Sequence, residues 1–456
     1  MKQKTVRSAA LVAGIVATGA LATSAQAQTN PNDSLLNKLV DKGILTAKEA
    51  QELRAEASPE SKGNSARSMG MPDWVTSLKL YGDFRGRVED FWADNPAYTT
   101  RTRYRYRLRL GTTITLKDDF EIGIRLSSAD PADKNNVAIG GNPVSANTTL
   151  QSGSSRKFIF LEQAYAKWTP IHTEDWTASA TIGKMDNPFE ISNMVIDYDY
   201  LPEGAALQAA YKVTDRNTVK VNGGIFVLNE LNQGPDASHD PYFAGAQALW
   251  NAKWTPKIES TLGVSAFTLG SKENLNTGAA LPNVNVGNTR DGLGNLLYSY
   301  NPIIGSASVT YKLRDFSLFF YPGAIDFPIR VGGEYMENPA ARSANKGFWA
   351  GVTFGKATKQ RTWELNYKYQ KLDSDAWYEE IVDEDNGAFY QTAPLGGAAG
   401  WAGGTNVKGH VFKAIYALTD SLQFIVSAYH NELIHPNPPG SQSAANHLMV
   451  DLLWKF

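Results

Sequence analysis

The 456-residue chain contains no cysteine, only six histidines and a formal net charge of −2. Without cysteine, disulfides, thiolate catalysis and cysteine-based zinc sites are excluded. The near-balanced charge gives no reason to expect a nucleic-acid partner. No stretch reaches the roughly 18 to 20 continuous apolar residues that a good transmembrane helix needs. If the protein spans a membrane, it must therefore do so as a β-barrel.

Sequence motifs of common hydrolases and metalloenzymes are also missing. No HExxH spacing, GxSxG elbow or P-loop occurs. The histidines are scattered along the chain at His172, His239, His410, His430, His435 and His447. We therefore expect a protein that is not an enzyme and that uses no cofactor and no metal.

The N-terminus has the composition of an export signal. A positively charged start precedes an apolar run at residues 9–22, and Ala25-Gln26-Ala27 forms a small-x-small cleavage site. We expect residues 1–27 to be a signal peptide that is removed, so that the mature chain begins near Gln28. The h-region is too short, and too rich in Ala and Gly, to be a membrane anchor.

Residues 28–72 differ from the rest of the mature chain. Apolar residues recur at helical spacing between about Asp33 and Ala57, which predicts two short periplasmic helices. They could form a docking or oligomerisation element, or a marginal helical hairpin without a specific partner. The Ser/Gly/Asn/Pro-rich stretch from Ser58 to Pro72 is typical of a flexible linker. The remaining segment, 73–456, is the predicted barrel domain.

The last ten residues alternate between apolar and polar positions. One face carries only apolar side chains, namely Leu448, Val450, Leu452, Trp454 and Phe456. This pattern suits the closing strand of a transmembrane barrel, because hydrocarbon tolerates no unpaired sheet edge. An amphipathic edge strand of a soluble sheet is the alternative. In a barrel, Trp454 and Phe456 would be the assembly signal read by the barrel-assembly machinery.

From Trp74 onward the hydrophobic period is close to 2. In one segment every second residue is an arginine, with Tyr or Leu at most of the intervening positions; the arginines are Arg101, Arg103, Arg105, Arg107 and Arg109. Burying unpaired charges costs several kcal/mol or more each. That face must line water or meet matching acids, so these residues, with Arg85, Arg87 and Arg125, are the predicted basic wall of a pore.

Counting such segments predicts an all-β fold: an antiparallel transmembrane barrel of about sixteen strands. Short turns, as at 117–119 and 214–217, alternate with longer polar loops, as at 130–156, 271–301 and 373–407. Short periplasmic turns and long outer loops are typical of outer-membrane barrels. The stretch from Arg314 to Phe327 has an apolar run longer than a turn needs, and the pattern gives it no placement.

A barrel of about sixteen strands leaves an aqueous channel. The loop between the fifth and sixth predicted strands carries acids and almost no base; the acids are Asp186, Glu190, Asp197 and Asp199. If the loop folds inward, these acids face the arginines and create a transverse field across a constriction. Alternatively, the acids lie on a solvated outer loop, and the arginines pair with acids of neighbouring strands such as Asp83 and Glu121.

Several segments resemble the putative porin family of Gram-negative outer-membrane proteins. They are the arginine-rich strand running into residues 108–111, the turn and strand at 118–126, Gly183–Phe189 and Pro202–Ala206. The resemblance covers nearly all of the mature chain. It implies an outer-membrane barrel that serves as a diffusion channel, but it supplies no catalytic or ligand residues.

Two functions follow as expectations. The first is a porin for passive diffusion of small polar or charged solutes; the alternative is a structural or adhesion barrel with a plugged or narrow lumen. In the second case acids of the 373–407 loop could hold divalent cations or lipopolysaccharide, or they could simply be solvated. Expected partners are outer-membrane lipid, lipopolysaccharide, the assembly machinery and small hydrophilic solutes, with a homotrimer or a monomer both compatible. Anion or cation preference stays open.

Overall fold

The computed structural model describes residues 70–134, 137–231, 239–277, 284–317 and 319–456. The predicted signal peptide and the predicted helical segment, with nearly all of its linker, lie outside these ranges. Within them, the only helix is a short 3-10 turn, Lys272–Asn274, which follows β12. None of the described helical structure is long and apolar enough to cross a membrane.

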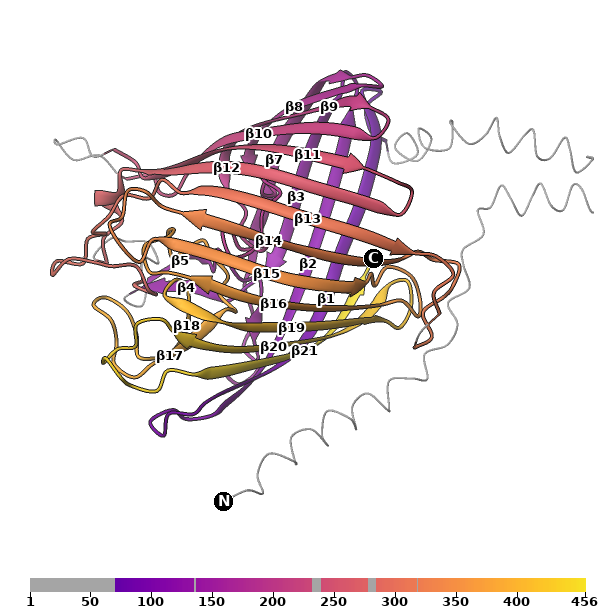
Figure 1. The fold of residues 1–456 in the computed structure, drawn as a ribbon. Coiled ribbons are helices and arrows are strands. Elements are labelled where there is room, and N and C mark those ends of the chain that lie inside the picture. The colour runs from indigo at the N-terminus through magenta and orange to yellow at the C-terminus, as the bar shows by residue number, and fades with distance from the viewer. Residues whose placement is uncertain (1–69, 135–136, 232–238, 278–283, 318) are drawn as a thin grey trace, which may run out of the picture. The chain divides into compact units, whose positions relative to one another are not determined.

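Strands dominate the described chain, and Figure 1 labels most of them, numbered in chain order. Sixteen of them form the wall: β1 Val75–Ala93, β2 Arg101–Leu116, β3 Phe120–Ser128, β7 Ile159–His172, β8 Trp176–Lys184, β9 Glu203–Thr214, β10 Asn217–Val227, β11 Tyr242–Lys253, β12 Ile258–Gly270, β13 Ile303–Leu313, β14 Phe327–Glu337, β15 Lys346–Gly355, β16 Trp363–Leu372, β19 Val407–Ala417, β20 Leu422–Leu433 and β21 Ala445–Lys455. Five short strands lie in the long loops: β4 Pro131–Lys134, β5 Val137–Gly141, β6 Thr148–Thr149, β17 Gly387–Tyr390 and β18 Gly400–Gly403.

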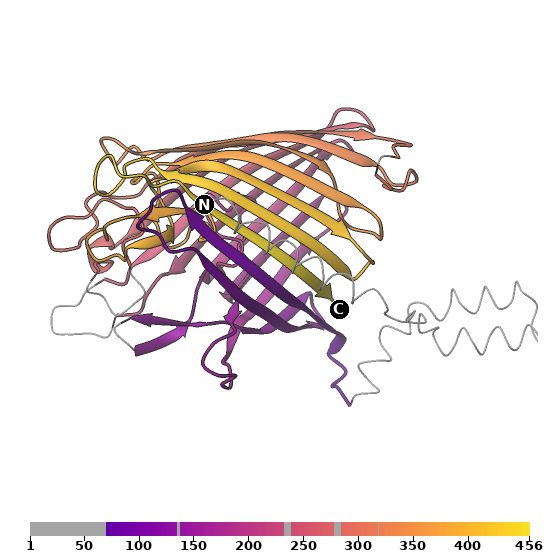
Figure 2. The ribbon, with the colours of Figure 1, turned by 90° about the horizontal axis from the view of Figure 1, so that it is seen from below.

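The wall is a closed antiparallel barrel. Each of the sixteen strands pairs with the next one along the wall, and β1 also pairs with β21, so no edge remains open. Figure 2 shows the indigo β1 beside the yellow strands of the C-terminal end. The predicted strand number is therefore confirmed. The short turns predicted at 117–119 and 214–217 join β2 to β3 and β9 to β10.

Side chains alternate across the wall as the sequence pattern predicts. On β2, Tyr104 and Leu110 are 50% and 48% exposed on the outer face, whereas Arg105 and Arg107 are buried on the inner face. The C-terminal strand follows the same rule, with Met449 and Asp451 buried inside and Trp454 exposed outside beside Phe84. Period-2 alternation thus sets an apolar outside against a polar inside.

Long loops at one end of the barrel fold into its interior. Met194, Val195 and Ile196 of the loop after β8 are fully buried against inward side chains of β10 and β11, such as Phe226 and Phe243. The loop after β16 joins the same apolar cluster through Trp377, Tyr378, Ile381 and Val382. The expectation that all of 373–407 lies outside was therefore wrong for residues 373–386. Its apolar side chains are buried inside the barrel, which removes them from water. The acids next to them in the sequence therefore also lie inside the barrel.

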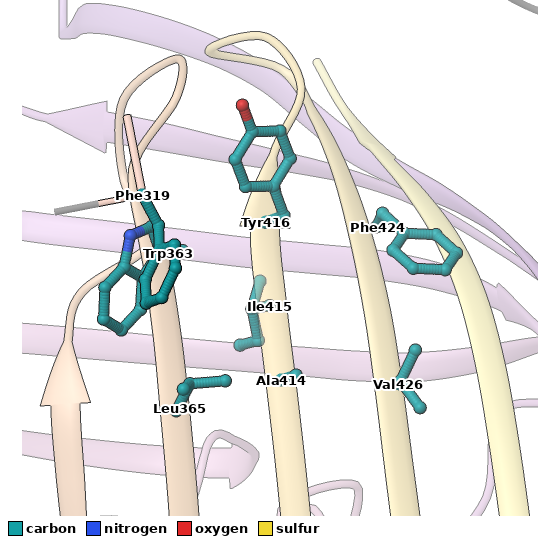
Figure 3. Close-up of a pocket in the computed structure, with 8 residues that line it drawn as sticks. All are labelled: Phe319, Trp363, Leu365, Ala414, Ile415, Tyr416, Phe424 and Val426. Carbon is teal, nitrogen blue, oxygen red and sulfur yellow. The ribbon is translucent and has the colours of Figure 1, made fainter. Parts of the chain in front are cut away.

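The stretch from Arg314 to Phe327 forms the turn between β13 and β14. Phe319 packs against Trp363 on the outer wall with ring centroids 6.3 Å apart, and Tyr321 and Phe327 meet the same indole edge-on. Figure 3 shows the apolar pocket of about 390 Å³ that Phe319 and Trp363 form with Leu365 and side chains of β19 and β20. The excess apolar residues of this turn therefore cover the outside of the barrel.

Candidate functional site: the charged interior of the barrel

The arginines of β1, β2 and β3 meet carboxylates inside the barrel. Arg87 binds Asp451 through two nitrogens at 2.7 and 2.9 Å, which ties β1 to β21. Arg103 and Arg105 both contact Glu89, at 2.6 and 3.4 Å. Because a buried charge is costly unless it is paired, these ion pairs allow the arginine row to face inward.

The deeper arginines of the row contact the wall and the inner loop together. Arg107 binds Asp83 of β1 at 2.8 Å and reaches Asp199 of the loop at 3.5 Å. Arg109 binds the same Asp199 at 2.9 Å and Glu162 of β7 at 2.6 Å. The two arrangements considered from the sequence therefore coexist, because the arginines pair with a neighbouring strand and with the loop at once.

Other predicted site residues are placed differently. Arg125 binds Glu162 and lies 3.6 Å from Asp186, but Glu190 pairs with Lys220 of β10 and not with an arginine. Arg101 lies at the exposed start of β2. Glu121, expected to pair with an arginine, instead accepts a hydrogen bond from the Tyr165 hydroxyl. Asp197 contacts no cation within 4 Å in the described chain.

The loop that carries these acids, residues 185–202, crosses the interior. The amide of Glu190 donates to Gln247 of β11 at 2.9 Å, and that of Ser192 donates to Glu334 of β14 at 3.0 Å. On the other side Asp199 reaches β2. Contacts with strands so far apart around the wall mean that the loop spans the lumen and narrows it.

A second inner loop, residues 373–386, lies against the first one. The amide of Asp197 donates to Ile381 O at 2.8 Å, and the amide of Asp383 donates to Asn193 O at 3.0 Å. This second loop is held in turn by a buried ion pair of 2.5 Å between Arg290, in the loop after β12, and Glu379. Three loops therefore interlock inside the barrel.

Sequence reasoning missed the role of the 373–386 loop and did not name Lys368 of β16 or Lys413 of β19 as site residues. The signal for the loop was present, since Trp377, Tyr378, Ile381 and Val382 interrupt its acids. A merely solvated acidic loop has no need of four such side chains. No comparable local signal marked Lys368 and Lys413 as lumen residues apart from the strand alternation.

A cavity of about 900 Å³ remains between the inner loops and the wall. Acids from both loops line it, including Asp197, Asp199 and Asp383. The wall contributes Arg85, Arg87, Arg107, Arg330, Lys368 and Lys413. The cavity is therefore lined by charges of both signs, with the loop acids across from cations of the barrel wall.

The two loop aspartates have opposite electrostatic environments. Burial alone raises the pKa of Asp199, but Arg109, Arg107 and Arg85 overcome it and hold that pKa below its usual value. Burial raises the pKa of Asp197, and the nearby carboxylates of Asp383 and Asp199 raise it further. The surroundings of Asp199 thus stabilise its anionic form, whereas those of Asp197 make ionisation harder than for an ordinary aspartate.

The acids of residues 373–385 do not assemble a cation site. Across the described ranges, no group of three or more His, Asp or Glu side chains is arranged to hold a metal ion. Asp375 instead accepts hydrogen bonds from Thr289, and Glu379 is bound by Arg290. These acids tie the inner loops together.

Comparisons with known proteins identify a matching family and similar folds. Residues 92–273 match the family described as putative porin. OprB of Pseudomonas putida, in a structure determined at high pH, is similar over 86% of this chain and 97% of its own, with 13% identity and a TM-score of 0.51. A porin mutant of Rhodopseudomonas blastica aligns over 83% of this chain and 100% of its own, with 10% identity and a TM-score of 0.38. No curated protein sequence matches.

The match covers the segment from the end of β1 to just beyond β12, which includes the arginine row of β2 and the first inner loop. The resemblance to the putative porin family is therefore confirmed over residues 92–273. Residues 92–273 match the putative porin family, and the chain has the closed antiparallel β-barrel fold of a porin.

Proposed function

We propose that this channel lies in the outer membrane and passes small polar or charged solutes by diffusion. The observation that carries the proposal is the cavity of about 900 Å³ between wall cations and loop acids inside a closed barrel. Only an apolar outer wall, as on β2 and β21, suits hydrocarbon, and only a polar lumen suits hydrated solutes. Export by residues 1–27, assembly through Trp454 and Phe456, and contact with lipid and lipopolysaccharide belong to the same proposal.

In this channel, selectivity is set where the arginines face the inner loop. The basic wall comprises Arg85, Arg87, Arg101, Arg103, Arg105, Arg107, Arg109 and Arg125, and the loop contributes Asp186, Glu190, Asp197 and Asp199. Preorganised charges of opposite sign across a narrow lumen orient dipolar solutes and exclude apolar ones. Of the loop acids, Asp199 makes the shortest ion pair with an arginine of the wall, Arg109, and it also contacts Arg107, so it is the proposed centre of the constriction.

The test is single-channel conductance of the refolded mature protein in a planar bilayer, with a salt-gradient reversal potential recorded in the same experiment. Steady ohmic steps are expected for an open pore. Arg105→Glu places a third acid beside Glu89 and Asp130, so the reversal potential should move towards cation preference. Arg105→Gln serves if the reversed variant does not fold. Arg314→Glu, on the turn between β13 and β14 with a side chain 55% exposed, is the control and should leave the reversal potential unchanged.

A structural or adhesion barrel is the second candidate. The interlocked loops of the interior favour it, because they fill much of the lumen with a packed apolar cluster. A correctly folded, heat-modifiable barrel without any conductance would support this candidate and contradict the diffusion channel.

A further inference from the structure

Arg85 differs from the other arginines of β1, β2 and β3 that are buried or half-buried. In the described chain it has no carboxylate within 4 Å, whereas Arg87, Arg103, Arg105, Arg107, Arg109 and Arg125 each have at least one. Its guanidinium donates to Asn147 Oδ1 at 2.7 Å, and its Nε is buried without a partner among the described residues. The nearest acids are already used, since Asp199 is bound by Arg109 and Asp451 by Arg87. Arg85 thus brings uncompensated positive charge to the cavity.

Lys413 of β19 brings a second uncompensated positive charge to the cavity. It lines the same cavity, and the described residues provide it with no hydrogen bond and no ion pair within 4 Å. It lies near enough to Arg85 to interact electrostatically, and its acidic neighbours at longer range are Glu364 and Asp451. Two cations that repel each other and lack acid partners leave room for an anion between them.

The wall between these two cations carries apolar side chains, interrupted by Ser427 and by Asp451, which is bound to Arg87. Val411, Ile425, Met449 and Leu453 point inward from β19, β20 and β21 and line the cavity. The part of the cavity wall on β13 is polar by contrast, with Ser306, Ser308 and Thr310. Apolar side chains do not bind hydrated ions, but they can contact the hydrocarbon part of a solute.

We propose that Arg85, Lys413 and the apolar strip form a subsite for an organic monoanion with an apolar body, such as an aromatic or branched monocarboxylate. This inference rests on the proposed channel function and names its solute class. The carboxylate would lie between the two cations, because hydrogen bonds to charged donors are the strong ones. The hydrocarbon would cover Ile425 and Leu453. Asp385 and Glu364, which face the same cavity, oppose a second negative charge on the solute.

Three probes test the subsite. Formate has the same charge as benzoate but no apolar body, and benzylammonium has a similar size but the opposite charge. Benzoate, formate and benzylammonium are added separately to a bilayer that contains the channel in potassium chloride, and the reduction of conductance is measured. Benzoate should reduce conductance at concentrations at which formate and benzylammonium have little effect. Equal inhibition by benzoate and formate would show that the apolar strip does not bind, and inhibition by benzylammonium would show that the charge preference is wrong.

Variants assign the effect to residues. Arg85→Gln and Lys413→Gln should each raise the half-inhibiting benzoate concentration roughly tenfold, which corresponds to about 1.4 kcal/mol. Ile425→Thr should weaken inhibition by benzoate but leave the response to formate unchanged. Arg330→Gln removes another cation of the cavity wall. Arg330 lies on β14 and donates a hydrogen bond to Ser308 of β13, away from the proposed subsite, so this variant should not alter benzoate inhibition. Equal effects of Arg85→Gln and Arg330→Gln would overturn the assignment.

A binding measurement separates this inference from the channel proposal. Isothermal titration calorimetry of benzoate against the folded full barrel in detergent does not require conduction. Conductance steps without benzoate binding would leave the channel intact and refute the subsite. Binding that Arg85→Gln abolishes, in a barrel without conductance, would support the subsite and refute the diffusion channel.

Discussion

The aromatic ring of Phe456 occupies the space that a Cβ on Gly82 would need. The two residues also exchange main-chain hydrogen bonds of 2.9 and 3.1 Å where the last residue of the chain meets β1. A Cβ on Gly82 would lie 2.6 Å from the Phe456 ring and 2.4 Å from the carbonyl oxygen of Arg109. The ring edge could move, but the Arg109 main chain belongs to β2. Glycine at this position therefore allows the Phe456 ring to lie against β1 where the barrel closes.

Gly82→Ala should destabilise the barrel by about 1–3 kcal/mol, the usual cost of overpacking. The measurement is the urea midpoint of the heat-modifiable folded band in detergent. Gly86→Ala is the matched control, because it lies on the same strand and a Cβ there has nothing within 4 Å. It should change stability by no more than about 0.5 kcal/mol. Equal destabilisation by both variants would show that strand glycine itself, and not the contact with Phe456, is responsible.

The wall of the barrel could be predicted from the sequence because its signal is local. Alternation along β2, with Arg105 and Arg107 against Tyr104 and Leu108, requires only residues adjacent in the chain. Strand number follows from counting such segments. The short strands β17 and β18 were not predicted, because they lie within a loop and are too short to show a clear alternation.

The arrangement of the interior could be predicted only in part, because its contacts join distant segments. Asp199 lies between Arg107 and Arg109, which precede it by about 90 residues, and Arg290 finds Glu379 at a similar separation. The sequence showed that the arginines need partners, and it named Asp83 among the candidates. The sequence could not show that Asp83, and not Glu121, would pair with an arginine, because that depends on the side-chain conformations across paired strands.

Loss of the buried ion pair between Arg290 and Glu379 should release the inner loops. Their side chains are 1% and 0% exposed, so Arg290→Met leaves a carboxylate buried without its cation, at a cost of about 3–5 kcal/mol. Limited proteolysis of the folded protein in detergent should then cleave within residues 373–386 faster than in the wild type. A double variant, Arg290→Met with Glu379→Gln, should recover part of the protection because no charge remains buried.

The control for this experiment is Lys359→Met. It breaks the ion pair with Asp420, whose side chains are 67% and 65% exposed, and such pairs contribute little. Its proteolysis pattern should match that of the wild type. Unchanged cleavage in Arg290→Met as well would mean that apolar packing alone holds the loops.

Truncation of Trp363 should weaken the turn between β13 and β14. The indole meets Phe319, Tyr321 and Phe327 at centroid distances of 5.0 to 6.3 Å. Because the side chain is only half-buried, Trp363→Ala should cost roughly 1–2 kcal/mol, less than a fully buried tryptophan. The readout is the temperature at which the folded band disappears on a gel. Trp92→Ala removes an outward indole that has no aromatic partner in the described chain, and it should have a smaller effect.

The contact between the two inner loops should loosen as the pH rises. Burial raises the pKa of Asp383 to about 7 and that of Glu384 to about 8, and the neighbouring Asp385 raises both, while Lys368 and Arg105 oppose the shift. Both values lie above those of an unfolded chain, about 4, so the packed loops hold extra protons between about pH 4 and 8. The stabilisation is therefore complete below about pH 4, and it is lost as the pH rises through 7 to 8.

Hydrogen–deuterium exchange within residues 373–386, corrected for the intrinsic effect of pH, should be faster at pH 9 than at pH 6. Ionised Asp383 and Glu384 would then repel Asp197 and Asp385, although the main-chain hydrogen bond between Asp383 and Asn193 remains. The double variant Asp383→Asn with Glu384→Gln should exchange at the same corrected rate at both pH values. Asp118→Asn, on an exposed turn at the other end of the barrel, should keep the wild-type response. A response that persists in the double variant would place the titrating groups elsewhere.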